Sequence, residues 1–157
     1  MRQLSALFIG RFQPFHKGHL DVVRQVLRLY PKIIIGIGSA QYSGMPKNPF
    51  SAAQRIRMIR GSLRAANIST RKFALVKISD IHNDNRWVKH VEKLAPQFGD
   101  VWSGTKKVQK LFRKDGKHKT VRPKFNLNIS GTKIRALMKT KKKWQHLVPS
   151  AVENLCK

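Results

Sequence analysis

Two histidines three residues apart are the side chains of this sequence with the clearest capacity for chemistry. His16 and His19 lie where an apolar run ends and a segment of helical period begins. That spacing on a first helical turn points both imidazoles toward the same side, and a helix start offers unpaired N–H groups and a positive dipole end to an anion. Arg11 adds a permanent charge with bidentate reach, and Gly18 lets a bulky anion approach the backbone. The stretch therefore predicts a polyphosphate-binding turn.

A second stretch, Ile-Ser-Gly-Thr-Lys-Ile-Arg at residues 129–135, has the same properties. Ser130 or Thr132 can cap a helix there, and Gly131 allows close approach. Arg135 falls on the first turn, where it can reach back to an anion at the helix start. Each stretch also has an ordinary interpretation: an N-capped helix with a basic residue, or a strand–helix turn with solvated histidines.

The elements that must position these residues follow from apolar runs and helical periodicity. Apolar or β-branched runs predict strands at 4–9, 32–37, 72–78, 100–102 and 119–122. Segments of helical period predict helices at 17–29, 52–66, 86–94, 106–113, 132–139 and 148–155. Ser51 is expected to be the N-cap of the second helix. This alternation predicts an α/β fold, a doubly wound open parallel sheet with right-handed crossovers. Its ligands are expected beyond the carboxyl ends of the strands. We expect one domain over residues 1–157, with C-terminal helices from about residue 131.

Composition limits the partners and the compartment. Thirty-three Lys and Arg face seven Asp and Glu, for a formal charge of +26, which attracts nucleotides, nucleic acid or an acidic surface. The basic residues are densest after residue 105. A secondary nucleic-acid contact and a general basic bias of a solvated surface both remain open. Cys156 is the sole cysteine, and no apolar run approaches the ~20 residues of a membrane span. With no secretion signal recognised either, we expect a cytoplasmic protein with no membrane partner.

The first stretch is the basis of a resemblance to a known family. Residues 10–19, Gly-Arg-Phe-Gln-Pro-Phe-His-Lys-Gly-His, resemble the signature of the H-x-G-H nucleotidyltransferases, and more narrowly of the archaeal-type nicotinamide-nucleotide adenylyltransferases. Residues 129–135 resemble the I-S-G-T-x-I-R signature of the same family. Further similar segments are 35–41, 48–52, 80–88, 103–104 and 144–149. The resemblance covers nearly the whole chain.

The resemblance implies a Rossmann-like nucleotidyltransferase fold and a reaction. AMP passes from ATP to nicotinamide mononucleotide, and the products are NAD and pyrophosphate. The catalytic residues it implies are His16, His19 and Arg135. The ATP- or phosphate-binding residues it implies are Gly10, Arg11, Phe12, Gly18, Lys47, Ser130, Gly131 and Thr132. The nicotinamide-nucleotide-binding residues it implies are Ser39, Asp80, Ile81, Trp87, Ser103 and Gly104.

The resemblance also implies partners. Magnesium is expected to arrive with the triphosphate, and His82 and His90 lack the third ligand of a zinc site. A homo-oligomer, often a hexamer in archaeal relatives, is expected. Trp87 is expected to stack on the cationic nicotinamide ring, although a plain core aromatic is an equal alternative.

The chain departs from the family pattern at several positions. Gln54 stands where the family usually has Glu, Thr105 where it has Asn, Lys133 where it has Glu, and Lys47 where relatives have Arg. The stretch 115–128 is shorter and more basic than usual. A related adenylyltransferase with another acceptor, such as phosphopantetheine or FMN, therefore stays open. A nucleic-acid-binding protein that kept the fold stays open as well.

Overall fold

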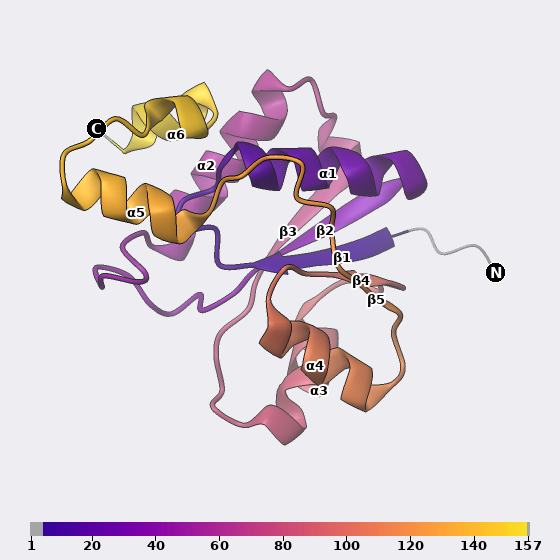
Figure 1. The fold of residues 1–157 in the computed structure, drawn as a ribbon. Helices are drawn as coiled ribbons and strands as arrows, with labels where there is room; N and C mark the ends of the chain where they lie inside the picture. The colour runs from indigo at the N-terminus through magenta and orange to yellow at the C-terminus, as the bar shows by residue number, and fades with distance from the viewer. Residues whose placement is uncertain (1–4, 157) are drawn as a thin grey trace.

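A computed structural model describes residues 5–156; residues 1–4 and 157 lie outside it, so the predicted start of the first strand at Leu4 does too. Its centre is a five-stranded, all-parallel sheet in the order β3-β2-β1-β4-β5 (Figure 1). The strands are β1 Ser5–Gly10, β2 Lys32–Ile37, β3 Phe73–Lys77, β4 Val101–Trp102 and β5 Thr120–Val121. The predicted doubly wound parallel sheet is confirmed.

The central strand explains why the apolar runs do not alternate. Ala6 and Phe8 of β1 belong to one buried cluster, and Leu7 and Ile9 belong to another on the opposite face. Because helices cover both faces of the sheet, every position of β1 meets apolar neighbours, which is typical of parallel sheets.

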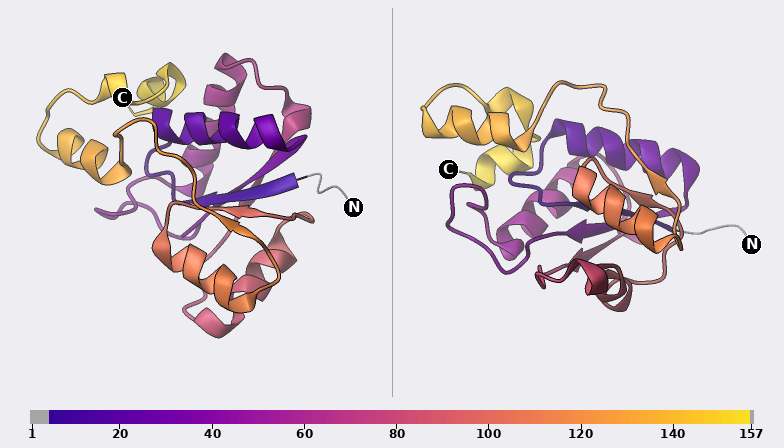
Figure 2. Two further views of the ribbon diagram at one scale, coloured as in Figure 1. Left: turned by 45° about the vertical axis from the view of Figure 1, so that its right-hand side comes forward. Right: turned by 60° about the horizontal axis from the view of Figure 1, so that its bottom comes forward.

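Helices form the two outer layers. They are α1 Lys17–Leu29, α2 Ala52–Ala65, α3 Asp84–Leu94, α4 Lys106–Asp115, α5 Gly131–Lys139 and α6 Ser150–Leu155, with short 3₁₀ turns at Thr70–Lys72 and Gln145–Leu147. Helices α1, α2, α5 and α6 pack on the Phe8 face, and α3 and α4 pack on the Leu7 face (Figure 2). None of the helices within residues 5–156 is long and apolar enough to cross a membrane.

Helix boundaries differ slightly from the predicted ones. Helix α3 begins at Asp84, two residues early, and α6 begins at Ser150, because Pro149 is extended and acts as its N-cap residue. Ser130 caps α5 by accepting from the Lys133 N–H at 3.1 Å, so Ser130 is the cap and Thr132 is not. The predicted cap at Ser51 of α2 is confirmed.

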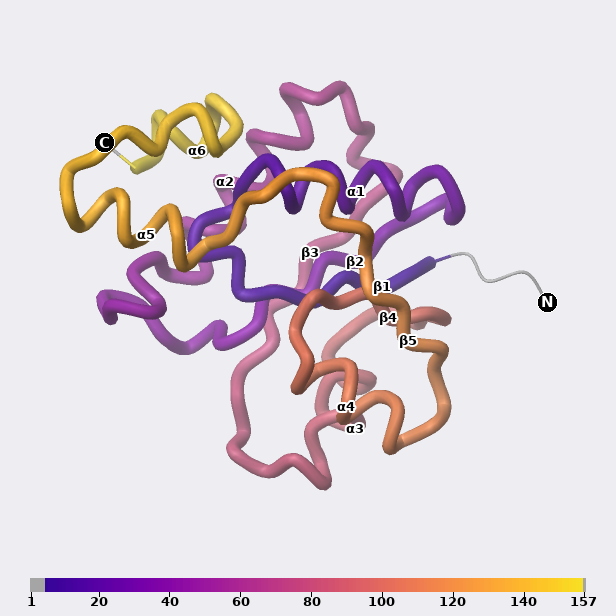
Figure 3. Tube along the Cα trace, viewed as in Figure 1, coloured from indigo at the N-terminus to yellow at the C-terminus, as the bar shows by residue number. Residues whose placement is uncertain are grey.

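The topology brings the two predicted motifs together. The chain adds β2 and β3 on one side of β1 and then crosses back to add β4 and β5 on the other side. The carboxyl end of β1 therefore lies where the strand order reverses, and ligands of such sheets bind there. The segment after β5 then runs over α1 to the start of α5 (Figure 3). There the Arg135 guanidinium donates to the Gln13 carbonyl at 2.8 Å, which joins residues 122 positions apart.

Candidate active site

The two predicted histidines cap α1 together. His16 is the N-cap residue and His19 is the third helical residue. The His19 N–H donates to His16 Nδ1 at 3.3 Å, and the His16 N–H donates to His19 Nδ1 at 3.1 Å. Because each Nδ1 accepts a hydrogen bond, the proton of each neutral ring lies on Nε2. The helix cap thus leaves an Nε2–H on each ring as the donor for a ligand.

Aromatic packing holds the two rings and keeps them neutral. The ring centroids of His16 and His19 are 3.5 Å apart, and the two ring planes are nearly parallel. His19 also stacks on Phe15 and meets Phe12 in an edge-to-face arrangement. Burial lowers the pKa of His16 to about 4. Burial, and then the nearby His16, also lower the pKa of His19. Both rings are therefore uncharged hydrogen-bond donors at neutral pH.

We expect the stability of the fold to fall as the pH drops because of His16. The unfolded chain takes a proton at its ordinary pKa of about 6.5, while the folded ring resists it down to about pH 4. The contribution is therefore complete above pH 6.5 and about 3 kcal/mol is lost by pH 4. Urea unfolding at pH 7.5, 5.5 and 4.5 measures it. The control is His16→Asn, which keeps a cap acceptor without titrating; equal pH slopes for the two proteins would contradict the assignment.

The first cavity of the site, about 360 Å³, joins both motifs. The histidine pair, the loop after β1 and the start of α5 surround it. Residues predicted for ATP or catalysis that line it are Gly10, Arg11, Phe12, His16, His19, Ser130, Gly131, Thr132 and Arg135. Gly104, predicted for the nicotinamide nucleotide, lines this cavity instead, together with the Phe125 ring that packs against it. The residues around it contribute imidazoles, guanidinium groups, hydroxyl groups and a helix N-terminus, and none of the described ones is Asp or Glu. This composition suits a polyphosphate.

Arginine side chains at this cavity repel one another. Burial and then the positive charge of Arg11 lower the pKa of Arg135. The same two causes lower the pKa of Arg55, behind the loop, to about 10. A bound anion would relieve this repulsion, so the electrostatics favour an occupied site over an empty one.

A second cavity, about 270 Å³, holds most of the residues predicted for the nicotinamide nucleotide. Ser39, Asp80, Ile81 and Trp87 line it. The Ser39 hydroxyl donates to Asp80 at 2.8 Å, which fixes that carboxylate. Trp87 lines this cavity, is partly buried and packs edge-on against Phe112 of the core cluster, so it contacts both the cavity and the core.

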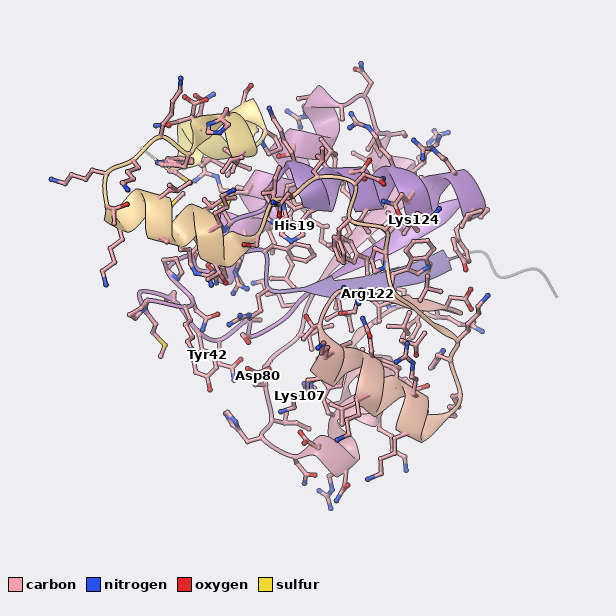
Figure 4. The ribbon with its side chains drawn as sticks, viewed as in Figure 1. His19, Tyr42, Asp80, Lys107, Arg122 and Lys124 are labelled. Carbon is pink, nitrogen blue, oxygen red and sulfur yellow. The ribbon has the colours of Figure 1, made fainter. Side chains whose placement is uncertain are left out.

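Two loops are joined beside this second cavity. The Tyr42 hydroxyl and the His82 ring hydrogen-bond at 2.9 Å, and the Gln41 side-chain amide donates to the Asp80 carbonyl and accepts from the Asp80 N–H. Tyr42, Asp80 and Lys107 lie on the same side of the molecule in Figure 4, and Asp80 and Lys107 line the second cavity. The polar loops after β2 and β3 therefore build one binding surface.

The two cavities adjoin at the carboxyl end of β1. Ile9, Gly10, Arg11 and Thr105 line both of them. Arg11, whose side chain is exposed, therefore stands between the cationic first cavity and the second cavity, to which Trp87 contributes an aromatic ring. A group bound in one cavity can be transferred to a ligand in the other across this shared wall.

Three predicted residues lie elsewhere. Lys47 is exposed in a tight turn and lines neither cavity. Ser103 is fully buried, with its hydroxyl accepting from the Thr105 N–H, so it shapes the turn from within. Gly18 is buried; an added Cβ would come 2.9 Å from the His16 ring. Its lack of a side chain makes room for that ring, which differs from the predicted approach of an anion.

Sequence reasoning missed two residues of the site. Arg55 is fully buried and donates to the carbonyls of Arg11 and Gly38, at 2.8 and 2.7 Å. The Phe125 ring lies on Gly104 and remains 49% exposed at the first cavity. The sequence signal for Arg55 was an arginine on the apolar face of the predicted helix 52–66. The exposed Phe125 in a basic loop carried no local signal, because its neighbour Gly104 is 21 residues away.

The side chains that could bind a metal ion are dispersed or have other partners in the described part of the chain. Within residues 5–156, no group of three or more His, Cys, Asp or Glu side chains is arranged to hold a metal ion. His82 instead pairs with Tyr42, and the His90 ring contacts Ser79.

Comparison with known proteins gives consistent relatives. The family model described as cytidylyltransferase-like matches residues 7–137. A nicotinamide-nucleotide adenylyltransferase of Methanococcus aeolicus is 41% identical over 97% of this chain and 87% of its own. The enzyme of the same name from Thermoplasma volcanium is 45% identical over 96% of this chain and 84% of its own.

Solved structures agree with these relatives. A bifunctional NMN adenylyltransferase/ADP ribose pyrophosphatase from Francisella tularensis superposes with a TM-score of 0.80 and 28% identity over 93% of this chain. The chain spans only 45% of that bifunctional protein. A second structure of the Francisella protein, complexed with AMP and a manganese ion, gives a TM-score of 0.80 at 26% identity.

Proposed function

This chain belongs to the cytidylyltransferase-like family, and within it to the archaeal-type nicotinamide-nucleotide adenylyltransferases, and from that premise we propose that it transfers AMP from ATP to nicotinamide mononucleotide. The products are NAD and pyrophosphate. The observation that carries the proposal is the pair of adjoining cavities, one cationic and one partly aromatic, which share Gly10 and Arg11.

The proposed reaction asks for alignment and charge stabilisation. An oxygen of the acceptor 5′-phosphate forms a bond to the α-phosphorus of ATP, and the bond from that phosphorus to the bridging oxygen breaks. The leaving pyrophosphate takes the electron pair. The attacking phosphate is already an anion at neutral pH, so no general base is required. The protein has to hold two polyanions in line and stabilise the charge that develops on the leaving group.

The side chains take roles that follow from their places. The Nε2–H of His19, and that of His16 beside it, would donate to the phosphates, with His19 at the α-phosphate. Arg135 and the N-terminus of α5 would bind the β- and γ-phosphates. Arg11, on the shared wall, can reach phosphates of both nucleotides.

The second cavity would take the nicotinamide end. Trp87 offers an aromatic face to the cationic ring. Asp80, fixed by Ser39, would accept from the carboxamide N–H. We propose this assignment for nicotinamide mononucleotide, and the test below compares it with other acceptors.

Magnesium enters the proposal as part of the substrate MgATP. The first cavity is lined by cations and imidazoles, which fit the oxygens of the triphosphate rather than a bare metal ion. The manganese ion bound with AMP in the Francisella structure supports a divalent cation. We further propose a cytoplasmic enzyme and a homo-oligomer, for which a hexamer is our first expectation.

The direct test is pyrophosphate release with MgATP and one acceptor at a time. We expect turnover with nicotinamide mononucleotide, and NAD as the product on chromatography. Nicotinic acid mononucleotide, phosphopantetheine and FMN are the comparison acceptors. Faster turnover with one of the last two would replace the proposed acceptor. Folded protein without turnover on any of the four would overturn the proposed activity.

We expect Phe125→Ala to raise the KM for ATP by roughly ten-fold with little change in kcat. The half-exposed ring at the first cavity would stack on the adenine base, and such a contact contributes about 1–3 kcal/mol. The control is Leu127→Ala, an exposed apolar residue in the same loop that lines neither cavity. A KM unchanged by Phe125→Ala, or raised equally by both variants, would exclude this contact.

A further inference from the structure

A groove at the β5 edge of the sheet is separate from both cavities of the candidate active site. It lies between α1 and β5, holds about 330 Å³, and shares no lining residue with either cavity. We propose that this groove binds single-stranded nucleic acid. The inference stands beside the proposed enzymatic function and does not depend on it.

The groove combines cationic and apolar side chains. Its cations, called the rim below, are the exposed Arg28, Arg122 and Lys124. Its apolar side chains are the exposed Leu29, the partly buried Val121 and the buried Trp102. Leu29 is 69% exposed, the most exposed of the large apolar side chains in the described chain. Exposed apolar surface of this kind is available to pack against a planar base.

The far wall of the groove is held firmly in place. The Gln25 side chain donates to the Lys124 carbonyl at 2.7 Å and accepts from the Lys124 N–H at 3.2 Å. Asp21, one turn earlier on α1, accepts from Gln25 and from Asn126. The segment after β5 is therefore tied to α1 at two points, and the rim cations start from a fixed backbone.

The cations of the groove form no ion pair in the described part of the chain. No carboxylate lines the groove, and the nearby Asp21 accepts hydrogen bonds from the neutral side-chain amides of Gln25 and Asn126. Among residues 5–156, the basic side chains that form ion pairs with a carboxylate are Lys107, Lys117 and His118, and all three lie outside this groove. An external anion is thus the natural partner of the rim.

Single-stranded nucleic acid fits these features better than a small anion does. Such chains bind where cations follow the backbone and flat apolar surfaces receive the bases. The cationic surface also continues beyond the groove, through Arg24 one turn before Arg28 and through Lys119 just before β5. Arg122 and Lys124 lie on this side of the molecule, away from Tyr42 and Asp80 (Figure 4). A chain with many phosphates could contact the cations along this whole surface, whereas a small anion would contact only a few of them.

The test measures binding of a fluorescein-labelled twelve-nucleotide oligouridine by anisotropy at 50 and 200 mM salt. The groove variant is Arg28→Gln with Arg122→Gln and Lys124→Gln. The matched control is Lys139→Gln with Lys142→Gln and Lys143→Gln, which removes the same charge from the exposed C-terminal part of the chain. Both variants are checked for adenylyl transfer, which the groove variant should retain, and for unfolding.

We expect the groove variant to bind at least ten-fold more weakly, and the control to stay within about three-fold of the unchanged protein. The slope of log affinity against log salt should fall by about 2 in the groove variant only, since each phosphate contact contributes ~0.7 for single strands. Inorganic polyphosphate of matched phosphate number should compete less well than unlabelled oligouridine. Equal losses in both variants, equal competition, or no binding at 50 mM salt would overturn the proposal.

Discussion

His19→Ala is expected to lower kcat for adenylyl transfer by roughly 10²–10³, the loss that follows removal of one preorganised donor to developing charge. Three aromatic rings and the reciprocal cap with His16 hold this imidazole, so its Nε2–H is oriented before substrate arrives. Preorganisation of this kind acts mainly on the transition state. Steady-state kinetics with MgATP and nicotinamide mononucleotide would measure it.

His19→Gln is the matched variant for this prediction. A glutamine at the third helical position can accept the cap hydrogen bond with its oxygen and donate with its amide nitrogen. We expect it to recover at least ten-fold of the lost kcat, while both variants unfold within about 1 kcal/mol of the original protein. If His19→Ala raised KM and left kcat unchanged, His19 would be a ground-state binding group only.

Arg55→Met is expected to cost about 3 kcal/mol of the free energy of unfolding and to lower kcat about 100-fold. The guanidinium is fully buried and donates to the Arg11, Gly38 and Ser39 carbonyls. An apolar replacement leaves the Arg11 and Gly38 carbonyls without this donor, while the Ser39 carbonyl keeps its hydrogen bond from the Tyr42 N–H. Each buried acceptor without a donor costs about 1–3 kcal/mol, partly offset because the buried charge is removed as well.

The expected fall in kcat follows from the place of these carbonyls in the loops that form the two cavities. Arg11 and Gly38 belong to the two loops that form the cavities, and a displacement of 1 Å in such a site can cost about 100-fold. Urea unfolding and steady-state kinetics measure the two effects. Arg57→Met, on the exposed side of the same helix, removes the same charge and should change neither. Equal behaviour of the two variants would show that Arg55 does not position the loops.

Local sequence was sufficient for most of the fold. The unbroken apolar run before Gly10 predicted a strand buried on both faces, and the Ser51 and Ser130 caps were legible from residue type. These features depend on neighbours within a few residues, so periodicity and capping rules reach them. The start of α3 escaped prediction by two residues, because several polar residues there could each begin a helix. The start of α6 escaped prediction by two residues because Pro149 is extended and lies outside the first helical turn.

The candidate site was predicted in part. The grouping of His16, His19 and Arg135 around one cavity is what two motifs at the carboxyl edge of a parallel sheet predict. The grouping of Asp80 and Trp87 around the other cavity is what the family resemblance implied. The placement of Lys47 outside both cavities was not foreseen. A turn residue in a long loop has no periodicity that ties it to the sheet.

By itself, then, the sequence determined the parallel sheet, the two capped helix starts at the candidate site and the excess of positive charge. Only the tertiary structure decided the protonation and tautomer of His16 and His19, the caging of Arg55 by carbonyls, the place of Phe125 at the first cavity and the groove of Arg28 and Arg122. Periodicity and capping are local properties. Burial, hydrogen-bond partners and electrostatic fields depend on residues brought together from distant parts of the chain, and these set the chemistry of the site.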